Sequence, residues 1–179
     1  MYSLGYFDER DLALVAQALE VAEESVGDYF RLSDAAWGRY PYDVRTRAEL
    51  SPREESPTAL AQVLRMRKPP VAGRLRDWDF YRICLQDHNL LELIQREAVP
   101  ELMLPLITYV LAHELVHVVR FYRFHHLFEA DAEARQQEEA RVHAITSQAL
   151  AKAPLPHMQR VLNLYEQHGG AGREPAWCM

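Results

Sequence analysis

LPLITYVLAHELVHVVRFYRF, residues 104–124, is the stretch that decides the fold predicted for this chain. Apolar residues surround its polar positions on every side, and a helix that is apolar all round is typically buried. We therefore expect a buried helix over residues 105–124. The polar residues inside it, His113, Glu114 and His117, are costly to remove from water unless each of them finds a partner.

These polar residues form the motif His-Glu-x-x-His. Residues four apart lie on one face of a helix, so the imidazoles of His113 and His117 can bind the same Zn²⁺ ion. Glu114 lies about 100° further round and can reach the position where a catalytic zinc holds water. Zinc lowers the pKa of that water, and a carboxylate can then take its proton. We predict Zn²⁺ as the cofactor, the two histidines as ligands and Glu114 as the catalytic base. The alternative is that the three side chains satisfy one another in an ordinary core.

A catalytic zinc site needs a third protein ligand. The metzincin motif HExxHxxGxxH would supply a third histidine, but Arg120 and Arg123 occupy its glycine and last histidine positions. We therefore expect a glutamate from the following helix to complete the site. The candidates are Glu129, Glu133, Glu138 and Glu139.

The position of each glutamate along the second helix ranks these candidates. In an antiparallel helical hairpin the motif faces the region of Gln136, and Glu129 lies too near the turn. Glu138 is preferred as the metal ligand, because it is the one charged residue in an apolar stripe made of Ala134, Glu138, Val142, Ile145 and Ala149. Glu139, which shares a helical face with His143, is an alternative ligand, and Glu133 is another. For each glutamate, a solvated surface position is the competing interpretation.

With His113, Glu114 and His117 followed, after twenty intervening residues, by Glu138, the chain resembles the gluzincin group of zinc metallopeptidases. The resemblance covers residues 79–145. It implies a zincin-like fold and a small soluble enzyme that hydrolyses peptide bonds. In such enzymes an edge strand binds an extended substrate by strand addition, and the resemblance gives that role to residues 79–86.

The rest of the chain is predicted to be mostly helical. Apolar residues at helical spacing indicate a helix over residues 8–32 with Asp8 as its N-cap. Short strands are expected at residues 42–46 and 79–86. Further helices are expected at residues 58–67, 90–97, 129–151 and 156–167, with Asn89 as a cap for the second of these.

These elements predict an α+β fold that is mostly α, zincin-like, with a small β-sheet packed on the HExxH helix and a following glutamate-bearing helix. The 179 residues are expected to form a single domain, 1–179. Within it, residues 79–145 form the metal-site core and residues 168–179 form a tail.

Composition narrows the classes of partner and the location. The formal net charge of -6 argues against nucleic acid as a partner and leaves a peptide or protein substrate. Residues 102–119 just reach the length of a membrane span, but they contain Pro105 and the polar motif, and no second such run exists, so we expect no membrane association. The N-terminus lacks the basic and apolar regions of a secretory signal, which makes a cytoplasmic location the default expectation.

Five other residues have weaker functional interpretations. His143, Tyr109 and Tyr81 are candidate donors to a developing oxyanion, although core packing or an ordinary helix position explains them more simply. Asp87 and His88 are a candidate pair for orienting a metal-bound histidine, and a turn at the end of a strand explains them equally well.

Two further functions compete with the peptidase. The first is a zincin-like, non-catalytic metal-binding or regulatory domain, motivated by the small size of the chain and distinguished by whether the metal has an open coordination position. The second is a helical di-iron protein that uses the motif together with Glu138 and Glu139. It ranks last, because that architecture draws ligands from four helices and only two suitable ones are predicted.

Overall fold

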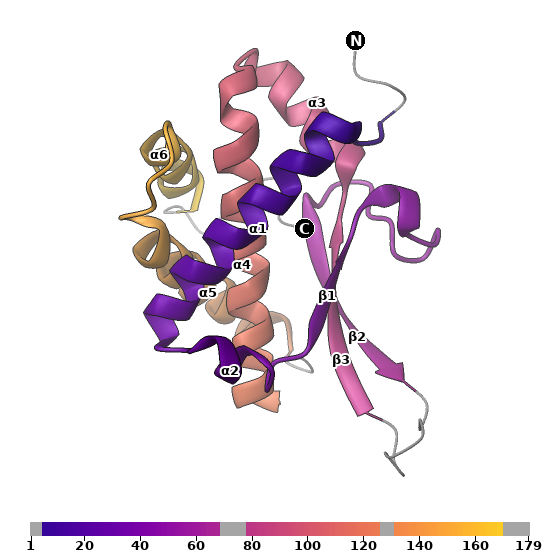
Figure 1. Ribbon diagram of the computed structural model, residues 1–179, viewed down its shortest axis with the longest axis vertical. Helices are drawn as coiled ribbons and strands as arrows, with labels where there is room; N and C mark the ends of the chain where they lie inside the picture. The colour runs from indigo at the N-terminus through magenta and orange to yellow at the C-terminus, as the bar shows by residue number, and fades with distance from the viewer. Residues whose placement is uncertain (1–4, 69–77, 126–130, 170–179) are drawn as a thin grey trace.

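The computed structural model describes residues 5–68, 78–125 and 131–169, and it confirms the predicted α+β, mostly helical class. Figure 1 shows the helices gathered on one side of a small sheet. In chain order the elements are α1 (Glu9–Phe30), α2 (Asp34–Trp37), β1 (Tyr42–Arg45), η1 (Arg47–Glu49), β2 (Ala61–Lys68), β3 (Trp78–Leu85), α3 (Asp87–Glu97), η2 (Pro100–Leu102), α4 (Met103–Arg123), α5 (Ala132–Leu150) and α6 (Met158–Gly169).

Helix α4, which carries the motif, is the centre of the fold. It contacts α1, α5 and α6 as well as strands β2 and β3. By length and composition alone, Pro100–Arg123 is apolar enough to cross a membrane, but 94% of its most apolar window is buried inside the protein. Packing against the surrounding elements therefore accounts for the apolar sequence that predicted this helix.

The sheet has the strand order β1-β3-β2. β1 runs parallel to β3, with Tyr42 opposite Tyr81, and β2 runs antiparallel to it, with Val63 opposite Ile83. The strands predicted at 42–46 and 79–86 are confirmed to within one residue. The role given to residues 79–86 is wrong, because β3 is bonded on both sides and has no free edge. Among the described residues, β2 is the edge strand beside α4.

The helix predicted over residues 58–67 is also wrong, since residues 61–68 form β2. Leu64 and Met66 are half-buried while Arg65 and Arg67 are exposed, which is the two-residue alternation of a strand with one covered face. Both arginines form ion pairs with Asp79 on the neighbouring strand. The partner strand decides the conformation here, and it is the next strand along the chain, β3.

The loop between η1 and β2 is held in place by the junction of β3 and α3. Gln86 is fully buried; its side-chain oxygen accepts from the Ser56 N–H, and its amide donates to the Glu54 carbonyl. The Asn89 amide donates to the carbonyls of Ser56 and Ala59, so Asn89 does not cap the helix as predicted. Helix α3 begins earlier, at Asp87. These bonds fix the loop as one wall of the pocket described below.

Asp87 joins three segments that are distant in the sequence. Its carboxylate is 1% exposed and accepts hydrogen bonds from the backbone N–H groups of Phe7 (3.0 Å) and Arg47 (2.9 Å). Burial raises the pKa of this carboxyl group, and the two backbone donors act in the opposite direction. The His88 ring contacts the Ser56 carbonyl. Both side chains of the predicted orienting pair therefore bond to structural backbone groups away from the motif histidines.

Replacing Asp87 by alanine is expected to lower the free energy of unfolding by about 2–4 kcal/mol, because two buried N–H groups lose their acceptor. Urea denaturation followed by circular dichroism measures the change. Glu92→Ala, at an exposed position of the same helix, is the matched control and should change stability by less than about 0.5 kcal/mol. Equal effects of the two substitutions would refute the role given to Asp87.

Candidate metal centre

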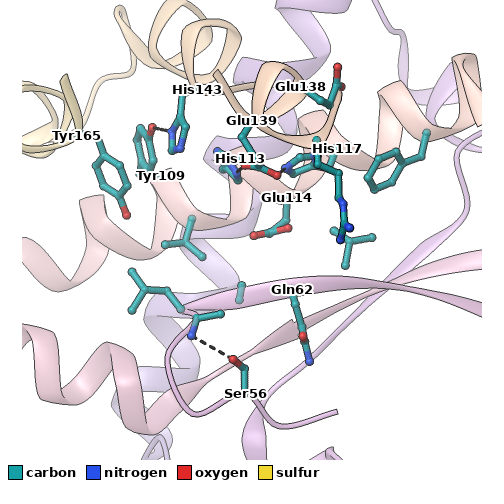
Figure 2. A pocket seen from close by; sticks show the side chains of 17 residues that line it. Ser56, Gln62, Tyr109, His113, Glu114, His117, Glu138, Glu139, His143 and Tyr165 are labelled. Atoms are coloured by element: carbon teal, nitrogen blue, oxygen red, sulfur yellow. Dashed lines mark hydrogen bonds and ion pairs between the residues drawn. The ribbon is translucent and has the colours of Figure 1, made fainter. Parts of the chain in front are cut away.

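Helices α4 and α5 place three polar side chains in contact. The Nε2 atom of His113 lies 3.3 Å from one carboxylate oxygen of Glu139, and the Nε2 atom of His117 lies 3.1 Å from the other. Figure 2 shows both rings and this carboxylate meeting between the two helices. Both histidines are buried, each with 7% of its surface exposed.

Each of these two separations is compatible with ligation of one metal ion, although the described group whose ligand atoms all lie within 4.8 Å of one another is His113, Glu139 and His143, without His117. In a tetrahedral zinc site with bonds of about 2.0–2.2 Å, neighbouring ligand atoms lie about 3.3–3.5 Å apart. The observed histidine–carboxylate distances are close to that value. The two histidines approach different oxygens of Glu139, so the carboxylate lies between them as a common partner. The donor set of two imidazoles and one carboxylate is one that zinc accepts.

Glu138, the preferred ligand in the sequence analysis, is engaged elsewhere. Its carboxylate is 5% exposed and forms a two-bond ion pair with Arg120 of α4, in which Arg120 Nη2 donates over 2.8 Å and Nε makes the second bond. Of the predicted inward stripe, Glu138, Val142 and Ile145 are buried, and Ala134 and Ala149 are half-buried. The cation that meets its carboxylate is a guanidinium, and the neighbouring residue, Glu139, reaches the histidines.

Arg120 therefore has a role that the sequence analysis did not assign. In the sequence, Arg120 stands out only because it occupies the glycine position of the metzincin motif. Its position one turn after His117, within a helix predicted to be buried, was the available signal, because a buried guanidinium requires a carboxylate. The Arg120–Glu138 pair joins α4 to α5 and fixes the rotation at which Glu139 faces the motif.

The charges at the centre are set by burial and by the carboxylate–imidazole contacts. Burial acts to raise the pKa of Glu139, but the hydrogen bonds with His113 and His117 outweigh it and hold that pKa well below its usual range. Burial acts to lower the pKa of His117, and Glu139 more than compensates, so this pKa is raised. A metal ion that binds there therefore competes with protons for His117 and Glu139.

Glu114 lies beside the cluster and lines the same pocket, and its carboxylate has no hydrogen-bond partner among the described residues. Burial raises the pKa of its carboxyl group, and the nearby histidines oppose the shift. In Figure 2 its carboxylate lies between the histidines and the strand that carries Gln62. A carboxylate with a raised pKa inside a pocket is suited to accept and then return a proton.

The motif opens into a pocket of about 350 Å³. One wall is the loop and edge strand, from Ser56 and Ala59 to Val63, and the opposite wall is α4 with α5. Its residues are Ser56, Ala59, Leu60, Ala61, Gln62, Val63, Tyr109, Val110, His113, Glu114, His117, Phe121, Arg135, Glu138, Glu139, His143 and Tyr165. The pocket brings the motif together with β2, an outer strand of the sheet that pairs on one side only among the described residues.

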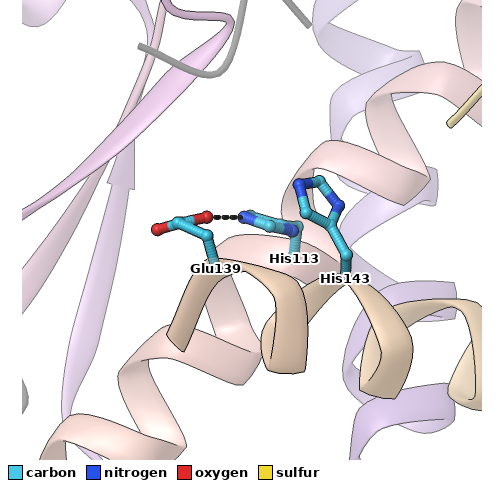
Figure 3. A group of neighbouring side chains, drawn as sticks. All are labelled: His113, Glu139 and His143. Carbon is cyan, nitrogen blue, oxygen red and sulfur yellow. Dashed lines mark ion pairs between the residues drawn. The ribbon is translucent and has the colours of Figure 1, made fainter. Parts of the chain in front are cut away.

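His143 is a further candidate metal ligand, in addition to His113, His117 and Glu139. One ligand atom each from His113, Glu139 and His143 lie within 4.8 Å of one another, and Figure 3 shows Glu139 and His143 on successive turns of α5. His143 Nδ1 is bonded to the Tyr109 hydroxyl at 2.9 Å, and Tyr109 stacks on Tyr165. Burial, together with the nearby His113, lowers the pKa of His143 to about 4, which keeps its ring neutral and able to bind a metal.

In each motif histidine, the ring nitrogen that faces away from Glu139 is Nδ1, and its hydrogen bonding differs from that in most metal sites. Such a nitrogen usually donates to a carboxylate or a carbonyl. Here Nδ1 of His113 and Nδ1 of His117 are buried without a hydrogen-bond partner in the described part of the chain. Ring packing orients them instead: His117 stacks on Phe121 with centroids 5.3 Å apart, and His113 lies parallel to Tyr109 at 6.4 Å.

The other predicted site residues lie outside this cluster. Glu133 is exposed and contacts the Gln137 amide. Tyr81 is 3% exposed and packs against Phe121 and Tyr122, in agreement with the core-packing interpretation. Glu129 falls outside the described residues.

Comparisons of the chain with protein-family models, with curated proteins and with solved structures returned no match.

Proposed function

We propose that the protein is a small zinc-dependent metallohydrolase that cleaves peptide bonds. The observation that carries the proposal is the simultaneous contact of Glu139 with both motif histidines, next to the buried Glu114 carboxylate in an open pocket. The proposed ligands are His113, His117 and Glu139, with Glu139 in place of Glu138, because Glu138 is neutralised by Arg120.

Each residue of the proposed site has a distinct task. Zinc held by these ligands would polarise a substrate carbonyl and lower the pKa of a water molecule. Glu114 accepts the proton of the attacking water and delivers it to the leaving amine. The outer edge of β2 has no strand partner among residues 5–68, 78–125 and 131–169, and it lines the pocket at Ala61, Gln62 and Val63; it aligns an extended peptide by backbone hydrogen bonds.

Purified protein is expected to carry about one zinc ion per chain when no metal is added during purification. Removal of the ion by a chelator should lower the melting temperature by about 5–10 °C, the shift expected for a ligand present at about 100 times its dissociation constant. Mass spectrometry of metals and differential scanning fluorimetry measure the two quantities. Protein without stoichiometric zinc, or without a response to added zinc, would contradict the proposal.

A non-catalytic metal-binding domain is the second candidate, favoured by the distance of His143 from His113 and Glu139. If His143 binds together with the three proposed ligands, the site has four protein ligands and no open position. Cobalt-substituted protein distinguishes the two: an open site changes its visible spectrum when acetohydroxamate is added, and a closed site does not.

A further inference from the structure

We propose that Arg135 forms a subsite for a carboxylate group of the peptide, located one helical turn from the metal centre. The proposal rests on the proposed function and specifies its substrate class. Arg135 lies four residues before Glu139, and His143 lies four residues after it, so the three share one face of α5. All three line the pocket. The metal centre thus lies in the middle of a row whose two ends differ in chemistry.

The order of contacts between the helices defines these two ends. Tyr109 meets His143, whereas Arg120, later in α4, meets Glu138, earlier in α5, so α4 and α5 run antiparallel. The end beyond His143 is aromatic, and Figure 2 shows Tyr109 and Tyr165 gathered there. Arg135 lies toward the opposite end, on the side of the metal centre where α4 supplies Phe121 to the pocket. A bound peptide therefore meets Tyr109 and Tyr165 at one end, and Phe121 together with the Arg135 cation at the other.

Arg135 carries the charge that remains after the other lining charges are paired. Arg120 neutralises Glu138. A divalent ion at the centre would balance Glu114 and Glu139. The Arg135 side chain is exposed, and among the described residues no ion pair or hydrogen bond of its guanidinium is recorded, although Asp131 and Glu139 each lie one turn away on the same helix. In a chain of net charge -6, this leaves a local positive site inside the pocket.

A carboxylate is the anion that fits a single guanidinium best. The planar group donates two parallel N–H bonds to the two carboxylate oxygens. Phosphate-recognition sites usually use a cluster of arginines, and Arg120, the other arginine near the centre, is already paired with Glu138. One helical turn is about 5.4 Å and an extended peptide rises about 3.3 Å per residue, so the carboxylate belongs within about two residues of the cleaved bond. It is supplied by an acidic side chain or by a free C-terminus.

The test measures peptide binding to the Glu114→Gln protein as purified, in which bound peptide is left intact. The probes are N-acetylated hexapeptides that are identical except for one residue, which is Glu, Gln or Lys at successive positions, each with a free or an amidated C-terminus. Isothermal titration calorimetry should show at least one carboxylate-bearing peptide binding about tenfold more tightly than its neutral counterpart. The position of the preferred Glu, or a preference for the free C-terminus, identifies the source of the carboxylate.

Three further substitutions in the Glu114→Gln background complete the test. Arg135→Gln should abolish the tenfold preference, and Arg135→Glu should shift it to the Lys peptides. Arg141→Gln removes an exposed arginine of the same helix that does not line the pocket, and the preference should persist. A preference that is absent from the start, that survives Arg135→Gln, or that cannot be measured because no peptide binds overturns the subsite. Peptide binding with the expected preference, together with failure of the unsubstituted protein to hydrolyse the same peptides, refutes the peptidase and leaves the subsite in place.

Discussion

Replacing Glu139 by glutamine is expected to lower the zinc affinity of the protein by about 10²–10³-fold, which corresponds to the share of one ligand in a site of several. The substitution keeps the size of the side chain but removes the negative charge that faces both motif histidines at 3.1 and 3.3 Å. Competition with a chromophoric chelator measures the affinity. Peptide hydrolysis should fall in proportion to the loss of bound zinc.

Glu138→Gln is the matched control, one residue away on the same helix. It should retain zinc, because Glu138 bonds to Arg120 and not to the histidines. It should instead lower the free energy of unfolding by about 3–5 kcal/mol, because Arg120, which is 8% exposed, is left without its counter-charge. If Glu138→Gln loses zinc and Glu139→Gln keeps it, the ligand assignment is reversed, and the preference for Glu138 from the sequence is restored.

Replacing Glu114 by glutamine is expected to reduce kcat for peptide hydrolysis by about 10²–10⁴-fold, the usual contribution of a general acid–base residue. The amide fills the same space in the pocket but cannot take a proton. Zinc content should stay unchanged, because the Glu114 carboxylate lies beside the ligand cluster and does not contact it in the way that Glu139 does. Steady-state kinetics on a fluorogenic peptide and metal analysis of the same preparation measure both quantities.

Arg141→Gln, outside the pocket, is the activity control and should match the unsubstituted protein. A Glu114→Gln protein that retains zinc and full hydrolytic activity would remove Glu114 from the mechanism. A protein that loses zinc would instead place this carboxylate among the ligands. The two results are separable because metal content and turnover are measured independently.

The parts of the fold that depend on local pattern could be predicted from the sequence. Helix α1 and its Asp8 cap could be predicted because the cap residue and the helical spacing lie within one segment; the structure adds a capping box between Asp8 and Asp11. The motif helix was anticipated because its apolar residues are contiguous. Strand β2 was missed because its conformation depends on pairing with β3, in a register that extends from Lys68 opposite Trp78 to Ala61 opposite Leu85.

The ligand assignment shows a similar limit. An inward-facing carboxylate at position 138 was anticipated correctly from the apolar stripe, but its partner was not. The stripe gives the face of the helix and does not identify the cation on the other side. Only the packing of α4 against α5 reveals that Arg120 meets Glu138, which turns Glu139 toward His113.

The outer edge of β2, unpaired within the described part of the chain, also affects how the protein behaves at high concentration. A strand whose outer backbone groups are open to a peptide is equally open to the edge of another molecule, and sheets with such edges tend to aggregate. Three of the last four residues of β2 are cations: Arg65, Arg67 and Lys68. Charged residues on an edge, lysine above all, oppose that association. Colloidal stability therefore depends on the basic end of the same strand whose first residues line the pocket.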